Sequence, residues 1–335
     1  MDRRRRRPAT ELAGLFLCGL VLASTVGAFA AHGLTSLGDA PIRGMLWVAK
    51  GADPVRALGS APTECLRRAA DPALAASVEI GRAAFRSTTL LGGQAGRAGI
   101  TCETCHRGGR SNPDFLFPGV SGAPGTADVT SSLFSSHRGN GVDDPKPIPD
   151  LSGPKAGLKV SQAPAEQALE PFIHGLITEE FDGPEPSPAV QQGLADYVRA
   201  LSPAACPAKP RERLGVTLLM ADTRRAVTAA RRSADIGDSA TAIAMIGGAR
   251  SRLGLIDERY AAPRLARARA DLRAADRRLA AAQTALHDHR PDATAQIAAW
   301  LTASRALEAE LAARQSASLF DPARLAASVK RRLPG

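Results

Sequence analysis

Aromatic side chains are scarce in this chain of 335 residues, where Phe, Trp and Tyr together account for 4%. Strands are enriched in aromatic and β-branched residues, whereas Ala, Leu and Arg favour helices. Because Ala and Arg dominate the composition, we expect a helical chain. No basic run after the N-terminus is interleaved with aromatic residues, so the formal net charge of +10 does not indicate a nucleic-acid partner. Such an excess of Arg is typical of a solvated helical face; attraction to an acidic protein partner or an anionic membrane surface is the alternative.

Sulfur-containing residues are also few, with five Cys and four Met in the chain and no Met between residues 46 and 219. Only Cys102 and Cys105 form a close pair. Because no second pair of suitable spacing accompanies them, the sequence excludes a four-ligand zinc site of the usual kind. Cys65 and Cys206 stand alone, and Cys18 belongs to an uncharged, apolar N-terminal stretch.

The N-terminus has the pattern of an export signal. The chain begins with MDRRRRR, and residues 12–30 contain no charged residue. Ala28-Phe29-Ala30 fits the small-x-small pattern of a signal-peptide cleavage site. The alternative is an uncleaved membrane anchor, because the uncharged stretch approaches the ~20 residues that a helix needs to span a bilayer. Both alternatives place the rest of the chain in the periplasm or another extracytoplasmic compartment, either soluble or attached through residues 12–30.

The patterns along the chain divide it into four parts. We expect a signal peptide or N-terminal membrane anchor over residues 1–30 and a leader with little regular pattern over 31–70. A central domain follows over 71–206, and a helical domain occupies 207–335.

The central domain combines helices with a long loop. Hydrophobic residues at helical spacing predict helices over residues 71–85, 164–183 and 188–201. Asp71 is a suitable N-cap, and Pro72 suits the first turn of the earliest helix. Residues 88–160 are rich in Gly, Pro, Ser and Asp, which indicates loop. A loop of this length in a compact domain indicates that something else, such as a large cofactor, organises it.

The helical domain has a heptad pattern. Leucines recur at every seventh position, at Leu265, Leu272, Leu279 and Leu286. Alanines lie between them, where small side chains allow a partner helix to approach closely. A similar apolar stripe runs through residues 292–314. We expect about three to five antiparallel helices in a bundle or long hairpin, with a coiled-coil dimer as the alternative. The fold class predicted for the whole chain is all-α.

One motif carries chemistry. Residues 102–106 read Cys-Glu-Thr-Cys-His, which has the form Cys-x-x-Cys-His. Cysteines three residues apart on a helical turn point to one face, where both thiols can bond to the two vinyl groups of one haem. The next residue, His106, then binds the iron from the proximal side. We predict a single haem c, covalently attached through Cys102 and Cys105.

Two other uses of a Cys-x-x-Cys pair fit this sequence less well. A thioredoxin-like redox pair requires a preceding strand and a βαβ setting, but Gly-Arg-Ala-Gly-Ile lies at residues 96–100. A simple disulfide between the two cysteines leaves His106 unexplained. Haem attachment accounts for all three residues.

The helices on either side of the motif resemble those of class I cytochromes c, in which an N-terminal and a C-terminal helix cross at the haem edge. The N-terminal helix of that family has a Gly with an aromatic residue four positions later, as Gly81 and Phe85 stand here. The C-terminal helix ends in an apolar-x-x-aromatic-x-x-x-Leu pattern, as Leu194, Tyr197 and Leu201 stand here. The resemblance implies a cytochrome c-like haem domain with long loops.

More closely, residues 72–203 resemble the C-terminal haem domain of the dihaem cytochrome c peroxidase and MauG superfamily. Besides the haem motif, the resemblance rests on three segments: Asp-Pro-Ala-Leu at 71–74, Gly-Arg-Ala-Ala-Phe at 81–85 and Ile-Pro-Asp-Leu at 148–151. The last is similar to the family's Thr-Pro-Ser-Leu segment near the haem. Those peroxidases use two haems, whereas this chain has one Cys-x-x-Cys-His. We therefore do not carry over peroxidase activity.

The sixth ligand of the iron has several candidates. Electron-transfer cytochromes place Met or His opposite the proximal His. His137, in a Gly-rich loop able to fold over the haem, is the first candidate for the distal ligand. His174, on an apolar helical face, is the second. A methionine of the helical domain, Met220 or Met245, and an open position are the remaining alternatives.

Cys65 and Cys206 bracket the central domain. If its terminal helices cross as in cytochromes c, the two ends of the domain come close together. An oxidising compartment then permits a disulfide between Cys65 and Cys206. Two unpaired thiols are the alternative.

These observations lead to three hypotheses about function. The first is electron transfer, in which the haem cycles between ferric and ferrous states and the partner is a redox protein of unknown identity. The second is a peroxidase-like or ligand-sensing haem protein with an open distal site, where His137 or Glu103 acts as acid or base. In the third, the helical domain is an interaction module and the haem domain an appendage. We expect an electron-transfer protein rather than an enzyme.

Overall fold

The computed structural model describes residues 42–131, 133–137, 139–153 and 158–332. Residues 1–30, where the signal peptide or anchor is predicted, lie outside the described residues. Within the described ranges, no helix combines the length and hydrophobicity needed to cross a membrane.

The fold is all-α, as the composition predicts. The eleven α-helices of the described residues are α1 (Pro54–Gly59), α2 (Pro72–Phe85), α3 (Gly93–Ala98), α4 (Cys102–Cys105), α5 (Leu169–Gly175), α6 (Pro188–Ala200), α7 (Val216–Asp235), α8 (Ser239–Arg259), α9 (Ala266–His287), α10 (Ala293–Ala313) and α11 (Pro322–Arg332). The four short strands in the same residues are β1 (Ser60–Pro62), β2 (Thr126–Ala127), β3 (Lys146–Pro147) and β4 (Arg211–Arg213). They form two antiparallel pairs, β1 with β4 and β2 with β3.

Local sequence determines where the two longest helices of the central region begin. The Asp71 carboxylate accepts hydrogen bonds from the backbone N–H groups of Ala73 and Leu74, and Pro72 occupies the first position of α2. This cap confirms the predicted start of the helix. Helix α6 begins in the same way, since the Ser187 hydroxyl accepts a hydrogen bond from the backbone of Val190.

The helix predicted over 164–183 is shorter than expected. Helix α5 covers only Leu169–Gly175 and continues as one π-helical stretch, Leu176–Glu180. A short 3₁₀ turn, Pro164–Glu166, precedes it. The apolar spacing marked the correct region, but the backbone at Gln167 and Asp182 is left-handed, which interrupts a regular helix before and after this stretch.

Helices α2 and α6 cross in direct backbone contact. A Cβ atom built on Gly81 would lie 1.8 Å from the carbonyl oxygen of Gly193, so no side chain fits at this position. Phe85 and Tyr197, one from each helix, then meet with ring centroids 5.1 Å apart. The close contact with α6 therefore requires glycine at position 81, and Phe85 packs against Tyr197.

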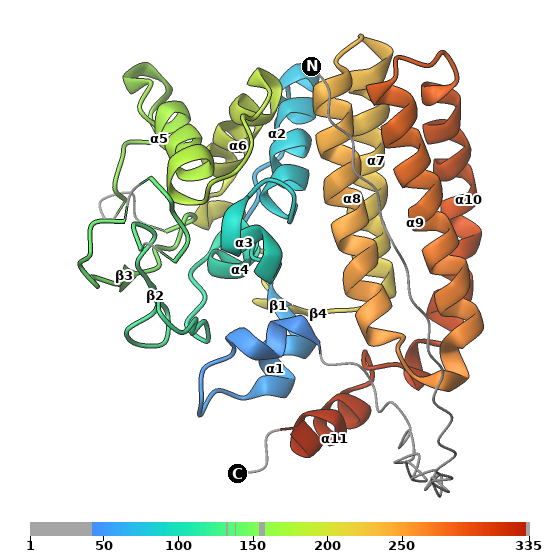
Figure 1. The fold of residues 1–335 in the computed structure, drawn as a ribbon, viewed down its shortest axis with the longest axis horizontal. Helices are drawn as coiled ribbons and strands as arrows, with labels where there is room; N and C mark the ends of the chain where they lie inside the picture. The colour runs from blue at the N-terminus through green and yellow to red at the C-terminus, as the bar shows by residue number, and fades with distance from the viewer. Residues whose placement is uncertain (1–41, 132, 138, 154–157, 333–335) are drawn as a thin grey trace, which may run out of the picture. The chain divides into compact units, whose positions relative to one another are not determined.

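Helices α7 to α10 form a four-helix bundle (Figure 1). Helix α7 packs on α8 and α10, and α9 packs on the same two helices. The connections between consecutive helices are short, so neighbours run antiparallel. All four heptad leucines are buried, as are the alanines between them: Leu265, Leu272, Leu279, Leu286, Ala268, Ala275 and Ala282. The heptad seam is thus filled within one chain.

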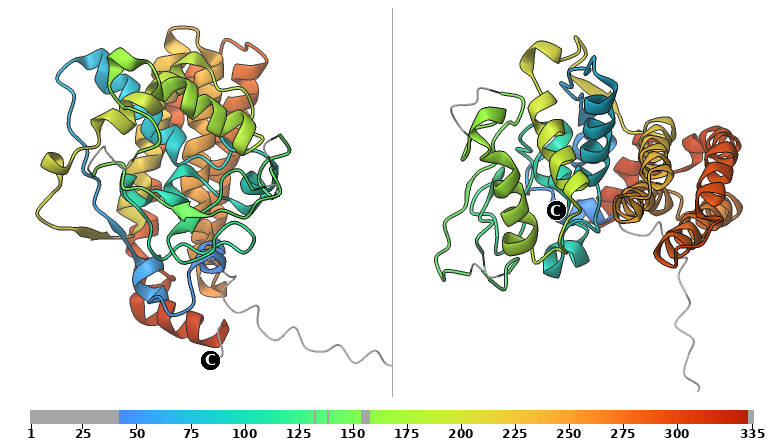
Figure 2. Two further views of the ribbon diagram at one scale, coloured as in Figure 1. Left: turned by 90° about the vertical axis from the view of Figure 1, so that its left-hand side faces the viewer. Right: turned by 90° about the horizontal axis from the view of Figure 1, so that it is seen from above.

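The bundle packs directly against the central region. Helices α7 and α8 both contact α2, which lies between α6 and the bundle (Figure 2). Hydrogen bonds cross this contact from Thr88 to Ser251, at 2.9 Å, and between Ser187 and Thr241, at 2.7 Å. Buried side chains of both parts belong to a single hydrophobic core.

Residues 42–62 contain regular structure that the sequence did not predict. A 3₁₀ turn, Arg43–Trp47, is followed by α1, whose N-cap Asp53 accepts hydrogen bonds from the next turn. Strand β1 then pairs with β4, with Ser60 opposite Arg213. A second small core joins this region to α11 through five buried side chains: Ile42, Leu58, Leu319, Leu325 and Val329.

Candidate functional site

The two motif cysteines lie on α4, a helix of a single turn. Thr101 and Thr104 fix this turn as a capping box, in which the backbone N–H of Thr101 donates to Oγ1 of Thr104 at 3.0 Å. Both cysteines are free thiols and line the same cavity. The short turn thus holds the two sulfur atoms on one face.

Burial raises the pKa of both thiols to about 12, so each is protonated at neutral pH. A thioredoxin-like cysteine requires the opposite, because its pKa is lowered to make a reactive thiolate. The raised pKa values of Cys102 and Cys105 therefore do not fit a thioredoxin-like redox pair.

His106 follows α4 and has a defined tautomer. Its Nδ1 atom lies 3.1 Å from the carbonyl oxygen of Pro149. A carbonyl can only accept, so Nδ1 carries the proton and Nε2 has a free lone pair. Burial lowers the pKa of His106 to about 4, and the ring is neutral at neutral pH. A neutral imidazole with a backbone hydrogen bond on its other nitrogen is the form that binds a metal.

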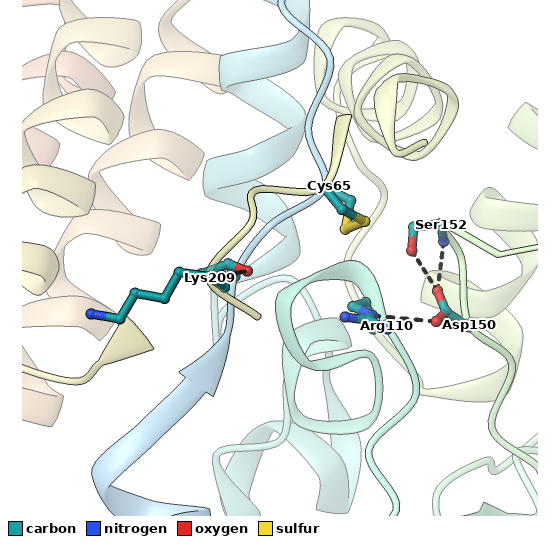
Figure 3. The surroundings of a disulfide bond; sticks show 7 residues. Cys65, Arg110, Asp150, Ser152 and Lys209 are labelled. Carbon is teal, nitrogen blue, oxygen red and sulfur yellow. Dashed lines mark hydrogen bonds and ion pairs between the residues drawn. A yellow bond between two sulfur atoms is a disulfide. The ribbon is translucent and has the colours of Figure 1, made fainter. Parts of the chain in front are cut away.

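The segment that supports His106 is itself fixed. Asp150 accepts hydrogen bonds from the backbone and hydroxyl of Ser152, at 2.9 and 2.7 Å, and from Arg110 at 3.4 Å (Figure 3). The backbone N–H of Leu151 donates to Gly109, directly after the motif. The Ile-Pro-Asp-Leu segment at 148–151 is thereby held next to the motif by the bonds of Asp150 to Arg110 and of Leu151 to Gly109.

A cavity of about 490 Å³ opens in front of the motif. Cys102, Cys105 and His106 line it together with side chains that are mainly apolar, including Phe85, Ile100, Ile148, Leu169, Phe172, Ile173, Ile177, Leu194 and Val198. Its volume lies within the range of about 300–1,000 Å³ typical of small-molecule and cofactor sites. Four helices contribute walls, namely α2, α4, α5 and α6.

The polar residues of the cavity wall are few and suit an apolar group with acidic substituents. Among the described residues, the charged side chains that line it are those of Lys146 and Lys159, with no carboxylate. Gln162 is 9% exposed, and its Oε1 atom has no hydrogen-bond partner among the described residues. A haem, with its apolar ring and two propionates, fits this wall.

The structure does not bring His137 to this cavity. Its Nδ1 atom lies 3.1 Å from an oxygen of Asp182, and its side chain is largely exposed. His174 is also outside the lining, with Nε2 2.9 Å from Glu185. Met220 and Met245 are fully buried in the bundle. Of the residues that the structure describes, His106 is the sole imidazole at the cavity, and no methionine lines it.

Glu103, between the two cysteines, points away from the cavity into a cluster of buried charges. Its Oε2 atom accepts hydrogen bonds from Arg86 at 3.2 Å and from Arg252 at 3.0 Å. Arg86 also binds Glu64 at 2.7 Å and Asp222 at 3.3 Å. Arg86 thus joins the leader, the motif and the bundle through three carboxylates. Glu103 is thus paired with two guanidinium groups. Its carboxylate is not free to act as a catalytic acid or base at the cavity.

This charge cluster was not predicted from the sequence. Glu103 and Arg252 are 149 residues apart, and no local pattern links them. The available signal was a charged residue between two cysteines predicted to face a cofactor, since a charge in such a place needs a partner.

Cys65 and Cys206 form a disulfide close to where α2 and α6 meet (Figure 3). The backbone around them is paired as well, since Leu66 forms an isolated bridge with Leu201 and the N–H of Ser202 donates to Cys65 at 2.8 Å. The disulfide thus links the two ends of the central region.

In the described residues, no three His, Cys, Asp or Glu side chains gather as a group that holds a metal ion; a haem iron needs a single axial imidazole. Comparisons of the chain with protein-family models, curated proteins and solved structures found no match.

Proposed function

We propose that this chain is an exported c-type cytochrome with one haem c that transfers electrons to or from a redox protein. The haem would be held by thioether bonds to Cys102 and Cys105, with His106 as its proximal iron ligand. A single observation carries the proposal: two thiols and an imidazole with a free Nε2 line one apolar cavity of about 490 Å³. Bound there, the haem supplies a one-electron couple between ferric and ferrous iron.

The protein's own residues prepare the site. The carbonyl of Pro149 keeps the Nδ1 proton of His106 in place and orients the ring. Phe85 lies 6.4 Å from this ring and, with Leu194 and Val198, closes the wall formed by α2 and α6. A wall of this kind excludes water, which favours the less charged ferrous state and so sets the potential of the couple.

A second candidate function is the binding of a small ligand at an open distal position. It is favoured by the placement of His137 and His174, which are bonded to Asp182 and Glu185 rather than directed into the cavity. A peroxidase-like or sensing role would follow from such a site.

Absorption spectroscopy of the mature protein tests these proposals. For electron transfer, we expect a reversible one-electron titration, a low-spin ferric spectrum and no spectral change when carbon monoxide is added to the ferrous form. A high-spin ferric spectrum with rapid carbon monoxide binding would replace electron transfer by the second candidate. His137→Ala is the matched variant: if His137 is the distal ligand, this change alone converts the low-spin spectrum to high-spin. A protein without haem absorption contradicts both proposals.

A further inference from the structure

A second cavity, of about 640 Å³, lies between α2 and the bundle helices α7 and α10. Its floor is apolar, with Ile80 from α2 and Leu301 from α10. None of the haem-cavity residues takes part in it, although both cavities share α2 as a wall. This second cavity, called the groove below, is therefore separate from the haem cavity.

Two of the four arginines that line this groove lack a carboxylate partner in the described part of the chain. Four arginines line it, against one carboxylate, that of Glu79. Arg224 and Arg225 have carboxylate partners in Glu308 and Asp222. The side chains of the other two, Arg232 and Arg305, are exposed and have no hydrogen-bond or ion-pair partner among the described residues.

Unsatisfied donors also face this groove. The buried Nε atom of Arg225 makes no hydrogen bond to the described residues; it lies 3.8 Å from Oε2 of Glu79, which likewise makes none. The half-buried hydroxyl of Thr228 likewise has no partner among these residues. A cavity with two unpaired guanidinium groups and a free hydroxyl, but only one carboxylate, is complementary to an acceptor-rich ligand.

We propose that the groove binds a small organic molecule with two oxyanion groups, either carboxylates or phosphates. The guanidinium fork matches the two oxygens of such a group and forms charge-assisted hydrogen bonds with it. Arg232 on α7 and Arg305 on α10 each bind one oxyanion group. The carbon skeleton between these groups lies on Ile80 and Leu301. A cavity of this volume suits a small molecule.

Calorimetric titration of the full-length mature protein tests this site, with succinate and inorganic pyrophosphate as separate probes at constant ionic strength. We expect saturable binding of at least one probe at a single site, and the better probe distinguishes a dicarboxylate from a diphosphate ligand. Arg232→Ala and Arg305→Ala should each weaken it about tenfold, as expected for loss of a charge-assisted bond. Arg278→Ala, which removes an exposed arginine on α9 outside the groove, should leave affinity unchanged.

Three results would overturn the proposal. In the first, neither probe binds saturably. In the second, Arg278→Ala weakens binding as much as the groove variants do, which shows that diffuse surface charge is responsible. In the third, only a polyglutamate peptide binds, and it loses affinity in the groove variants. The last result would identify the groove as a docking site for an acidic protein. Because the groove is separate from the haem cavity, each result is independent of whether haem is bound.

Discussion

Arg252, on α8 of the bundle, donates a hydrogen bond of 3.0 Å from Nη1 to Oε2 of Glu103, between the two motif cysteines. Its Nη2 atom donates to the backbone carbonyl of Arg86 at 2.7 Å. The bundle therefore contacts the motif turn itself and not merely the surface of the central region. The side chains of Arg86 and Arg252 are each only 9% exposed, so these bonds are shielded from solvent.

Replacing Arg252 should weaken the attachment of the bundle to the motif. In Arg252→Met, Glu103 keeps Arg86 but loses a charged hydrogen bond, and the carbonyl of Arg86 loses its donor. We expect the free energy of unfolding to fall by about 3 kcal/mol, measured by urea denaturation followed by circular dichroism. Arg278→Met, at an exposed position, should change it by less than about 0.5 kcal/mol. Equal stability of the two variants would show that the Glu103 contact does not stabilise the fold.

Acid should destabilise the protein through Glu64. Burial alone raises the pKa of this carboxyl, but the guanidinium groups of Arg86 and Arg82 and the hydroxyl of Tyr197 outweigh burial and hold the pKa below its ordinary value. Such a group stabilises the fold above the unfolded-state pKa of about 4.3, and this stability is lost as the pH falls through the lower folded-state pKa. We therefore expect the free energy of unfolding to decrease as the pH falls below about 4.3.

The matched variant is Glu64→Gln, which removes the titrating group. At neutral pH it should be less stable than the unmodified protein by about 3 kcal/mol, because Arg82 and Arg86 lose a buried partner. The two stability curves should converge as the pH falls. Parallel curves would indicate that Glu64 does not contribute to the acid sensitivity. Asp222 would then explain it, because Arg86 and Arg225 hold the pKa of this carboxyl low against the effect of burial.

How far the sequence predicts this structure depends on whether the interaction is local. The start of α2 followed from Asp71 and Pro72, because a cap acts within one turn. The seam of the bundle followed from leucines at heptad positions such as Leu272 and Leu279, which are fully buried. The contact between α8 and the motif did not follow, because any of the 43 basic residues in the chain was an equally suitable partner for Glu103.

The candidate site shows the same division. The residues of the motif, and their placement on one turn, are local properties that Cys102, Cys105 and His106 reveal by spacing alone. The position of the distal candidates is not local. His137 and His174 could be placed only once their carboxylate partners, Asp182 and Glu185, were known from the fold.

The crossing of α2 and α6 should not tolerate a side chain. In Gly81→Ala the new methyl group would meet the backbone carbonyl of Gly193, which has no rotamer with which to move aside. We expect a loss of about 3 kcal/mol or more in the free energy of unfolding. Gly254→Ala, inside α8 with open space around the new Cβ, should instead gain about 0.5–1 kcal/mol. Thermal denaturation measures both, and a neutral Gly81→Ala would contradict the close crossing.

The disulfide between Cys65 and Cys206 should contribute strongly to stability, because it joins residues 141 positions apart. In the chain-entropy model, a loop of this size corresponds to about 4–5 kcal/mol. The double variant Cys65→Ser/Cys206→Ser should unfold at a correspondingly lower denaturant concentration. The number of cysteines that react with a thiol-specific reagent should be the same in this variant as in the unmodified mature protein. Unchanged stability would show that the unfolded chain is not restricted by this bond.

The proposed function depends most on whether a haem is bonded to both motif cysteines. Intact-mass spectrometry of the protein, purified from a host that matures c-type cytochromes, tests this directly. We predict the mass of the chain plus one haem under denaturing conditions, with the added mass located on the peptide that contains Cys102 and Cys105, and no covalent haem in Cys102→Ala/Cys105→Ala. A colourless protein with the mass of the polypeptide alone would contradict the account.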